Sequence, residues 1–218
     1  MDIAVNEFVI ERIKQAYPKD RIYGEEVSSA GTEGGFTWVL DPVDGTQALE
    51  QGLNTVTCCL ARLDVDGKPI FGIVVNPATD ELFACRREGK STLNGKPVQV
   101  SDNKQFKGSY VYLGSRIQPE DLATNGVIYD RIEGAGGKVF NARSLSFGCM
   151  QVAKGAAVGA YIGVRTPFEA ASVQLIVEGA GGKVTDLHGR APGRMDGAID
   201  GLVVSNGKVH DQLLSVLL

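Results

Sequence analysis

Two carboxylates stand three positions apart at Asp41 and Asp44, in the segment DPVDGT that directly follows the apolar run 36–40. The run predicts a strand, Pro42 stiffens the turn after it, and a short helix is expected over 47–51. Carboxylate oxygens are the hard ligands that Mg²⁺ prefers, and backbone N–H groups at a helix start can face an anion. The segment therefore predicts a site for a divalent cation beside a phosphate group. The chemistry that such a site serves best is hydrolysis of a phosphate ester.

Further acidic residues lie on either side of this segment. Glu25 and Glu26 follow a predicted strand at 21–23, and Glu169 opens a helix that is predicted over 169–178. Carboxylates that converge in one cleft repel one another, so a shared cleft would need cations to offset their charge. Glu26 is open to two interpretations, a direct ligand or a solvated neighbour of Glu25.

Three motifs occur in order along the chain: Gly-Glu-Glu at 24–26, Asp-Pro-Val-Asp-Gly-Thr at 41–46, and Pro-Phe-Glu at 167–169 with a helix ending in Glu-Gly-Ala-Gly-Gly at 178–182. With these motifs the chain resembles the inositol monophosphatase-like family of metal-dependent, lithium-sensitive phosphatases over essentially its whole length. The resemblance implies an α/β (α+β) fold, a layered α-β-α-β-α sandwich of the sugar phosphatase type. It also implies a single unit over 1–218, with an antiparallel metal-binding sheet half at 1–105, an α/β half at 106–218, and the site between them.

The same resemblance implies a set of metal ligands. Glu25, Asp41 and the backbone carbonyl of Val43 would hold one cation, and Asp41, Asp44 and Glu169 would hold a second. Scattered carboxylates with a carbonyl suit Mg²⁺, of which two or three ions are expected, and Mn²⁺ is a possible substitute.

Catalytic and substrate contacts follow from the same resemblance. Asp2 and Thr46 match the pair that orients and deprotonates the attacking water. The N–H groups of Gly45 and Thr46 would bind phosphate oxygens at the helix start, and Ser144 would contact the substrate. Asp2 also stands at the head of a predicted helix, where a carboxylate stabilises the helix dipole in any case.

The chain departs from its family in three places. The family carries a further segment before the position that Asp2 matches, whereas this sequence starts at Met1. Without that segment the apolar stripe of the first helix would be exposed, so we expect a partner subunit to cover it in a homo-oligomer, most simply a dimer. Glu169 stands where the family has Asp, and the acidic residue that holds the inositol hydroxyls in animal enzymes is replaced by Ile162.

The substrate is therefore left open within one class of chemistry. The expected reaction is Mg²⁺-dependent hydrolysis of a small phosphate monoester, an inositol or sugar phosphate, by a metal-activated water. Alternatives are a 3′(2′),5′-bisphosphate nucleotidase, a fructose-1,6-bisphosphatase, or a non-catalytic relative that acts as a binding or assembly protein. Arg143, in the position of a family Gly, and Arg165 are candidates to contact a second anionic group.

Bulk composition excludes several other classes of protein. In 218 residues, 22 basic side chains stand against 26 acidic ones with no long run of one sign, which argues against a nucleic-acid partner. The sequence contains neither an apolar stretch of membrane-spanning length nor a signal-peptide pattern, so we expect a cytoplasmic protein. The partner that the family resemblance implies is a small phosphorylated metabolite. The four cysteines show no CxxC spacing and are expected to be reduced core residues. His188 and His210, the only histidines, are expected to be exposed, which argues against a zinc site.

Periodicity predicts the elements that position these residues. Residues 2–16 form a predicted helix whose apolar stripe is Val5, Phe8, Val9, Ile13 and Ala16. Strands are expected near 36–41, 55–64, 69–76 and 81–87, then a hairpin at 93–98, and later strands near 110–114, 138–141, 159–163 and 201–205.

The sequence EGAGGKV occurs at 133–139 and at 178–184. Because each copy ends a predicted helix and starts a strand, its glycines are expected to be helix C-caps and not a phosphate loop.

Overall fold

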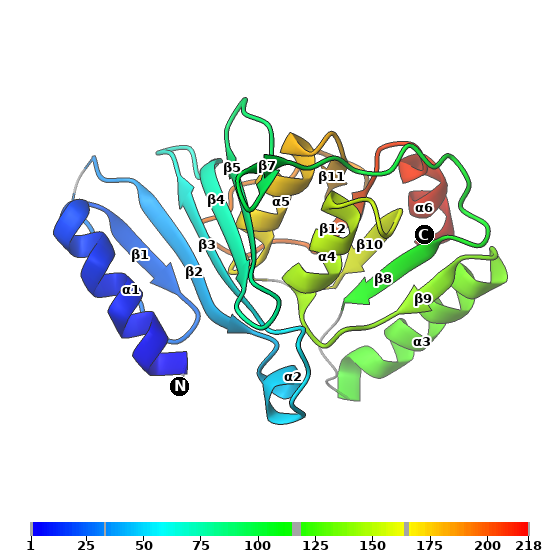
Figure 1. The fold of residues 1–218 in the computed structure, drawn as a ribbon, viewed down its shortest axis with the longest axis horizontal. Coiled ribbons are helices and arrows are strands. Elements are labelled where there is room, and N and C mark those ends of the chain that lie inside the picture. The colour runs from blue at the N-terminus through cyan, green and yellow to red at the C-terminus, as the bar shows by residue number, and fades with distance from the viewer. Residues whose placement is uncertain (1, 33, 115–118, 164–165, 218) are drawn as a thin grey trace.

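The molecule consists of two β-sheets with helices between them and on both outer sides (Figure 1). The computed structural model describes residues 2–32, 34–114, 119–163 and 166–217. α1 (Asp2–Ala16) covers the outer face of the first sheet, α4 (Leu145–Ala153) and α5 (Ala170–Gly179) lie between the sheets, and α3 (Pro119–Gly134) and α6 (His210–Leu217) cover the second sheet. The expected α-β-α-β-α layering is confirmed.

The first sheet contains seven strands in sequential order. They are β1 (Arg21–Gly24), β2 (Thr37–Asp44), β3 (Thr57–Leu63), β4 (Pro69–Asn76), β5 (Glu81–Arg86), β6 (Thr92–Leu93) and β7 (Lys96–Pro97). All neighbours pair antiparallel except β1 and β2, which are parallel, with Arg21 opposite Thr37. The antiparallel arrangement that was expected from 36–41 onward is confirmed, and β1 adds a parallel edge to it. The chain after β1 turns back, and the N–H of Thr32 bonds the carbonyl of Lys19 over 2.9 Å, which brings β2 to the start of β1.

The second sheet has the order β11-β12-β10-β8-β9. Its strands are β8 (Tyr110–Gly114), β9 (Lys138–Phe140), β10 (Gly159–Ile162), β11 (Lys183–Thr185) and β12 (Leu202–Ser205). β9, β8 and β10 are parallel, whereas β12 is antiparallel to both of its neighbours. Helical crossovers between parallel strands place α3 and α4 on opposite faces of this sheet.

The repeated EGAGGKV sequence ends a helix in both places. Gly136 has φ 85° and Gly181 has φ 88°, in the left-handed region that glycine enters at little cost. The N–H groups of Gly137 and Gly182 bond carbonyls of the last helical turn, those of Ile132 and Val177, both over 2.9 Å. The prediction of helix C-caps is confirmed, and each copy leads into a strand, β9 or β11.

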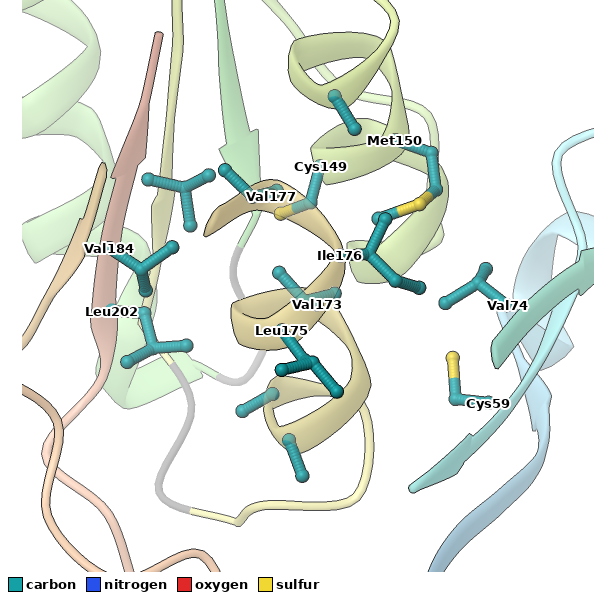
Figure 2. Packing of buried hydrophobic residues seen from close by; sticks show 14 of the residues in the cluster. Cys59, Val74, Cys149, Met150, Val173, Leu175, Ile176, Val177, Val184 and Leu202 are labelled. Carbon is teal, nitrogen blue, oxygen red and sulfur yellow. The ribbon is translucent and has the colours of Figure 1, made fainter. Parts of the chain in front are cut away.

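The main core surrounds α5. This helix is apolar on almost every side, because it contacts both sheets and has little surface facing water. Figure 2 shows Ile176 directed with Met150 toward Val74 of the first sheet, while Val184 and Leu202 of the second sheet lie on the other side of the helix. Glu169, at the start of α5, is thereby fixed between the two sheets.

The first helix packs on the outer face of the first sheet with part of its predicted apolar stripe. Ile13 is buried with Ile22 and Trp38, and Val9 packs against this cluster. Phe8, which belongs to the predicted apolar stripe, is 56% exposed and stacks with Arg12. The exposed part of the stripe agrees with the expectation, whereas the polar Asn6 of the same helix is fully buried.

Candidate active site

An irregularity in β2 brings the two aspartates of the DPVDGT segment to the same side of the sheet. Asp41 pairs with Cys59 and Asp44 pairs with Thr57, so two residues of β2 stand opposite one residue of β3. Side chains three apart in a regular strand point to opposite faces, and the extra residue of this bulge reverses that alternation. Pro42 supplies no N–H for a regular ladder, and the N–H of Val43 instead donates to Asp41 Oδ1 over 2.8 Å.

Three buried carboxylates meet beside this bulge. One oxygen from each of Asp41, Asp44 and Glu169 lies within 4.8 Å of the others, and all three side chains are at least 94% buried. Burial, followed by the charges of Asp44, Glu169 and Glu25, holds the pKa of Asp41 well above its usual value. The cluster consists of hard oxygen donors with concentrated negative charge, so it fits a divalent cation such as Mg²⁺.

Asp44 is also the most heavily hydrogen-bonded of the three. Its Oδ2 accepts from the hydroxyls of Thr57 at 3.2 Å, Ser144 at 2.9 Å and Ser146 at 2.5 Å, and from the N–H of Ser146 at 2.7 Å. Its Oδ1 accepts from the N–H of Leu145 at 3.0 Å. A carboxylate oxygen accepts more than one bond, so Oδ1 retains capacity for a metal ion while Oδ2 anchors the side chain.

Asp2 and Thr46 lie next to each other although 44 positions separate them. The Thr46 hydroxyl is 3.4 Å from Asp2 Oδ2 and also 3.4 Å from the carbonyl oxygen of Val43. Asp2 begins α1, and Thr46 begins the short α2 (Thr46–Glu50), so the proximity follows from the packing of α1 beside β2. The two residues predicted to handle the attacking water are therefore adjacent to a carbonyl predicted to hold a cation.

Gly45 occupies a position that no other residue fits. Its φ is 98°, and a Cβ on it would lie 2.9 Å from Ser144 Cβ and 3.0 Å from the carbonyl oxygen of Arg143. The turn that carries Asp44 and Thr46 consequently packs directly against the loop before α4.

Glu25 and Glu26 are both exposed. The N–H of Glu25 bonds the carbonyl of Leu40 over 3.0 Å, and the Glu25 charge reaches Asp41, whose pKa it helps to raise. Glu25 thus borders the cluster of three carboxylates without belonging to it. Its role as a ligand remains a prediction.

Ser144 is buried and caps the N-terminus of α4. Its hydroxyl accepts from the N–H of Phe147 at 3.2 Å and contacts Asp44 and Thr57. These contacts position the carboxylate, whereas the predicted contact of Ser144 with substrate remains a prediction. Arg165 lies outside the described residues.

Sequence reasoning missed three polar residues around the site. Thr57 and Ser146 surround Asp44, and the Nδ2 of Asn6 donates to the carbonyl of Val27 over 3.1 Å in the loop that follows Glu25. A Ser-x-Ser pair before an apolar helix is an N-cap signal that could have indicated Ser146. Asn6 lies one helical turn after Asp2, so both residues are on the same side of α1. This spacing is the sequence signal that could have indicated Asn6.

Cysteine and histidine take no part in the carboxylate cluster. All four cysteines are unpaired, which confirms the expectation of reduced thiols. His210, expected to be exposed, is only 1% exposed, because it begins α6 against the second sheet and contacts the hydroxyls of Thr185 at 3.0 Å and Ser205 at 2.8 Å. Burial, assisted by the charge of Lys183, lowers the pKa of His210 to about 4.

No helix in the described ranges is both long enough and apolar enough to cross a membrane.

Comparisons with known proteins agree with the geometry. The profile of the Inositol monophosphatase family matches residues 1–217. A histidinol-phosphatase of Chlorobaculum parvum is 31% identical over 216 residues, which are 99% of this chain and 81% of that protein. Inositol monophosphatase 2 of Solanum lycopersicum is 33% identical over 204 residues, 86% of this chain and 74% of that protein. The structure of an inositol monophosphatase from Anabaena (Nostoc) superposes with a TM-score of 0.90 at 25% identity, covering 99% of this chain and 85% of the other. The resemblance that the motifs indicated is confirmed.

Proposed function

Because the chain belongs to the inositol monophosphatase family, we propose that it hydrolyses the phosphate monoester of a small metabolite, an inositol or sugar phosphate, in a metal-dependent reaction. The observation that carries this proposal is the convergence of Asp41, Asp44 and Glu169 within 4.8 Å, beside the contact between Asp2 and Thr46. The family consists of phosphatases, and this arrangement supplies the two parts that the reaction needs, a cation site and a proton acceptor.

The proposed cation sites share Asp41. Asp41, Asp44 and Glu169 would hold one Mg²⁺ ion, and Asp41, Glu25 and the Val43 carbonyl would hold another, with a third ion possible and Mn²⁺ as a substitute. When bound, these ions would lower the pKa of a coordinated water and offset the charge on the phosphate.

The protein's own groups would orient the water and accept its proton. Thr46 Oγ1 donates toward Asp2 Oδ2, which leaves its lone pairs to accept a hydrogen bond from a water molecule. Asp2, which is partly exposed, is the carboxylate that takes the proton through this relay. The N–H groups of Gly45 and Thr46 would bind phosphate oxygens, and Ser144 would hold Asp44 in place beside the substrate.

The substrate is proposed as a class. One relative is named a histidinol-phosphatase and another an inositol monophosphatase, so both histidinol phosphate and inositol 1-phosphate belong among the first substrates to test. Ile162 is buried and apolar, so it supplies no polar group to hold inositol hydroxyls, which favours testing sugar phosphates beside inositol phosphate. Bisphosphates, including 3′-phosphoadenosine 5′-phosphate, complete the panel.

The test is phosphate release from this panel with Mg²⁺ and with a chelator, for wild type and Thr46→Val. Wild type should release phosphate only with the metal, and Thr46→Val should lower kcat by about 10²- to 10⁴-fold, the usual contribution of acid–base groups. Thr79→Val, at an exposed turn, is the matched control and should behave as wild type. Release by no substrate would favour the non-catalytic alternative, a binding or assembly protein.

A homodimer remains part of the proposal. Ile3 and Phe8 of α1 are 55% and 56% exposed, which is apolar surface that a second copy could cover. Light scattering at micromolar concentration would give a mass near twice 23.2 kDa, and a monomer mass would contradict the dimer.

A further inference from the structure

Arg143 has a backbone conformation that a long side chain seldom adopts. Its φ is 61°, and the other non-glycine residues with positive φ in the described ranges, Asp80, Glu88 and Asn94, occupy turns between neighbouring strands of the first sheet. Arg143 instead directly precedes Ser144, the N-cap of α4. The left-handed conformation is unfavourable for a side chain with Cβ, so surrounding contacts must hold it.

Three hydrogen bonds fix the loop around Arg143. The hydroxyl of Thr55 donates to the carbonyl of Ala142 over 2.6 Å, and the hydroxyl of Tyr112 donates to the carbonyl of Ser144 over 2.7 Å. The N–H of Arg143 itself donates to Asn141 Oδ1 over 2.8 Å. The carbonyls on both sides of Arg143 are thus fixed by side chains from β8 and from the chain before β3, which fixes the backbone at Arg143 and the direction of its Cα–Cβ bond.

That direction brings the guanidinium to the rim of the proposed active site. The Arg143 carbonyl lies beside Gly45, and Arg143 Nη1 donates to Gln47 Oε1 over 3.2 Å, in the first turn of α2 directly after Thr46. Arg143 therefore spans from the loop before α4 to the helix that starts at the proposed phosphate turn.

Arg143 differs in charge from the side chains of the proposed active site. The side chains proposed to bind cations in the site, such as Asp41 and Glu169, are acidic, whereas Arg143 is basic, exposed and without an ion pair within the described part of the chain. A guanidinium carries five N–H donors in a planar fork and can bind two oxygens of an anion at once, and the contact with Gln47 uses only part of this capacity.

We propose that Arg143, held beside Gln47, forms a second anion subsite that binds a second phosphate group of the substrate while its first phosphate is hydrolysed at the carboxylate cluster. The inference rests on the proposed phosphatase function and adds a specificity-determining residue to it. With this subsite, the preferred substrates would be small bisphosphates.

The test compares fructose 1,6-bisphosphate with fructose 1-phosphate and fructose 6-phosphate, for wild type, Arg143→Gly and Arg143→Lys. Wild type should prefer the bisphosphate in kcat/KM, and Arg143→Gly should lower the ratio of bisphosphate to monophosphate by about tenfold or more, mainly through KM. Arg143→Lys should recover part of the ratio, because lysine keeps the charge without the planar fork. Arg190→Ala, which alters an exposed arginine paired with Asp186 away from the site, should keep the wild-type ratio.

The glycine variant also separates loss of the side chain from loss of the fold. Glycine tolerates φ 61° without strain, so Arg143→Gly should unfold at the same temperature as wild type or a higher one. A bisphosphate-to-monophosphate ratio within twofold of wild type in this variant would overturn the proposal. An equal loss for all three substrates would also overturn it, because Arg143 would then bind the reacting phosphate.

Binding measurements distinguish a failure of this inference from a failure of the proposed function. Calorimetry with Ca²⁺ gives the affinity for each of the three sugar phosphates without relying on turnover. If wild type releases no phosphate but binds the bisphosphate more tightly and loses this preference in Arg143→Gly, the subsite stands and the proposed function fails. If phosphate release is Mg²⁺-dependent but neither affinity nor kcat/KM favours the bisphosphate, the function stands and the subsite is overturned. Absence of both release and binding preference overturns both.

Discussion

The hydroxyl of Ser144 donates to Oδ2 of Asp44 over 2.9 Å, joining two residues that are 100 positions apart. Ser144 caps α4, which packs on the second sheet, whereas Asp44 ends β2 of the first sheet. A proposed metal ligand is thus oriented by the opposite half of the chain. The proposed site consequently depends on the docking of the two sheets through α4 and α5.

Removing one donor to Asp44 should weaken this connection. Ser146→Ala deletes the hydroxyl that lies 2.5 Å from Asp44 Oδ2 and keeps the backbone N–H bond. We expect the free energy of unfolding to fall by about 1 to 3 kcal/mol, the usual effect of a lost hydrogen bond to a buried charged group. Urea unfolding in the presence of a chelator measures it. Ser215→Ala, on the exposed side of α6, is the control and should change stability by less than about 0.5 kcal/mol.

The sequence was sufficient to predict that the carboxylates of two separate motifs lie together. DPVDGT predicted a cation and phosphate turn because its chemistry is local, and the structure places Asp41 and Asp44 together with Glu169. Apolar runs bounded by turns predicted β3 and β4, and in each strand buried side chains alternate with partly buried ones over most of its length.

The parts that the sequence could not predict depend on tertiary packing. Thr57 and Ser146 are ordinary small polar residues until the docking of the sheets places them around Asp44. His210 is followed by the polar Asp211 and Gln212 in the sequence, yet it is buried where α6 meets the second sheet. Asn6 is a polar residue of α1, yet the packing of this helix buries it fully.

Neutralising Asp41 should have opposite effects on stability and on metal binding. The Asp41 carboxylate is 1% exposed and faces the charges of Asp44, Glu169 and Glu25, so without metal its ionised form is unfavourable. Asp41→Asn should raise the free energy of unfolding of the metal-free protein by about 1 to 3 kcal/mol near neutral pH. The same change should remove most of the stabilisation that Mg²⁺ gives to wild type.

Urea unfolding with and without Mg²⁺, together with calorimetric titration of Mg²⁺ or Mn²⁺, measures both effects. Asp64→Asn is the control, because Asp64 forms a surface ion pair with Arg87 at 2.7 Å far from the cluster, and it should leave the Mg²⁺ response intact. Equal metal binding by wild type and Asp41→Asn would show that the cation site lies elsewhere.

Stability should also depend on pH through His210. Its pKa falls to about 4 in the folded protein, from an ordinary value of 6.5, chiefly through burial and secondly through Lys183. The folded state disfavours the protonated ring of His210. The neutral ring therefore contributes its full stabilisation above pH 6.5, and the free energy of unfolding declines as the pH falls toward 4, by about 3 kcal/mol at most. His210→Gln should flatten the unfolding free energy between these values. His188→Gln, at an exposed ring 3.3 Å from Asp200, should keep the wild-type slope, and equal slopes for all three proteins would refute the assignment to His210.

Glu169 provides the last prediction, since the motifs predict it as the ligand that replaces the family's Asp. The residue is 6% exposed, directly precedes α5, and reaches the cluster with a side chain one methylene longer than that of Asp. Glu169→Gln keeps the length and removes the charge, whereas Glu169→Asp keeps the charge and removes the length. If charge in the cluster is what the reaction needs, Glu169→Gln should lower kcat/KM by about tenfold or more and raise the Mg²⁺ concentration for half-maximal activity.

Glu169→Asp should retain activity similar to wild type or improve it at low Mg²⁺, because a shorter side chain holds a cation in fewer conformations. Glu178→Gln, at the other end of α5, is the matched control and should leave the Mg²⁺ dependence unchanged. Phosphate release measured across a Mg²⁺ titration compares the four proteins. Wild-type activity of Glu169→Gln at limiting Mg²⁺ would mean that Glu169 only stabilises the start of α5, where a carboxylate faces the helix dipole. The cation site would then depend on Glu25, Asp41 and Asp44.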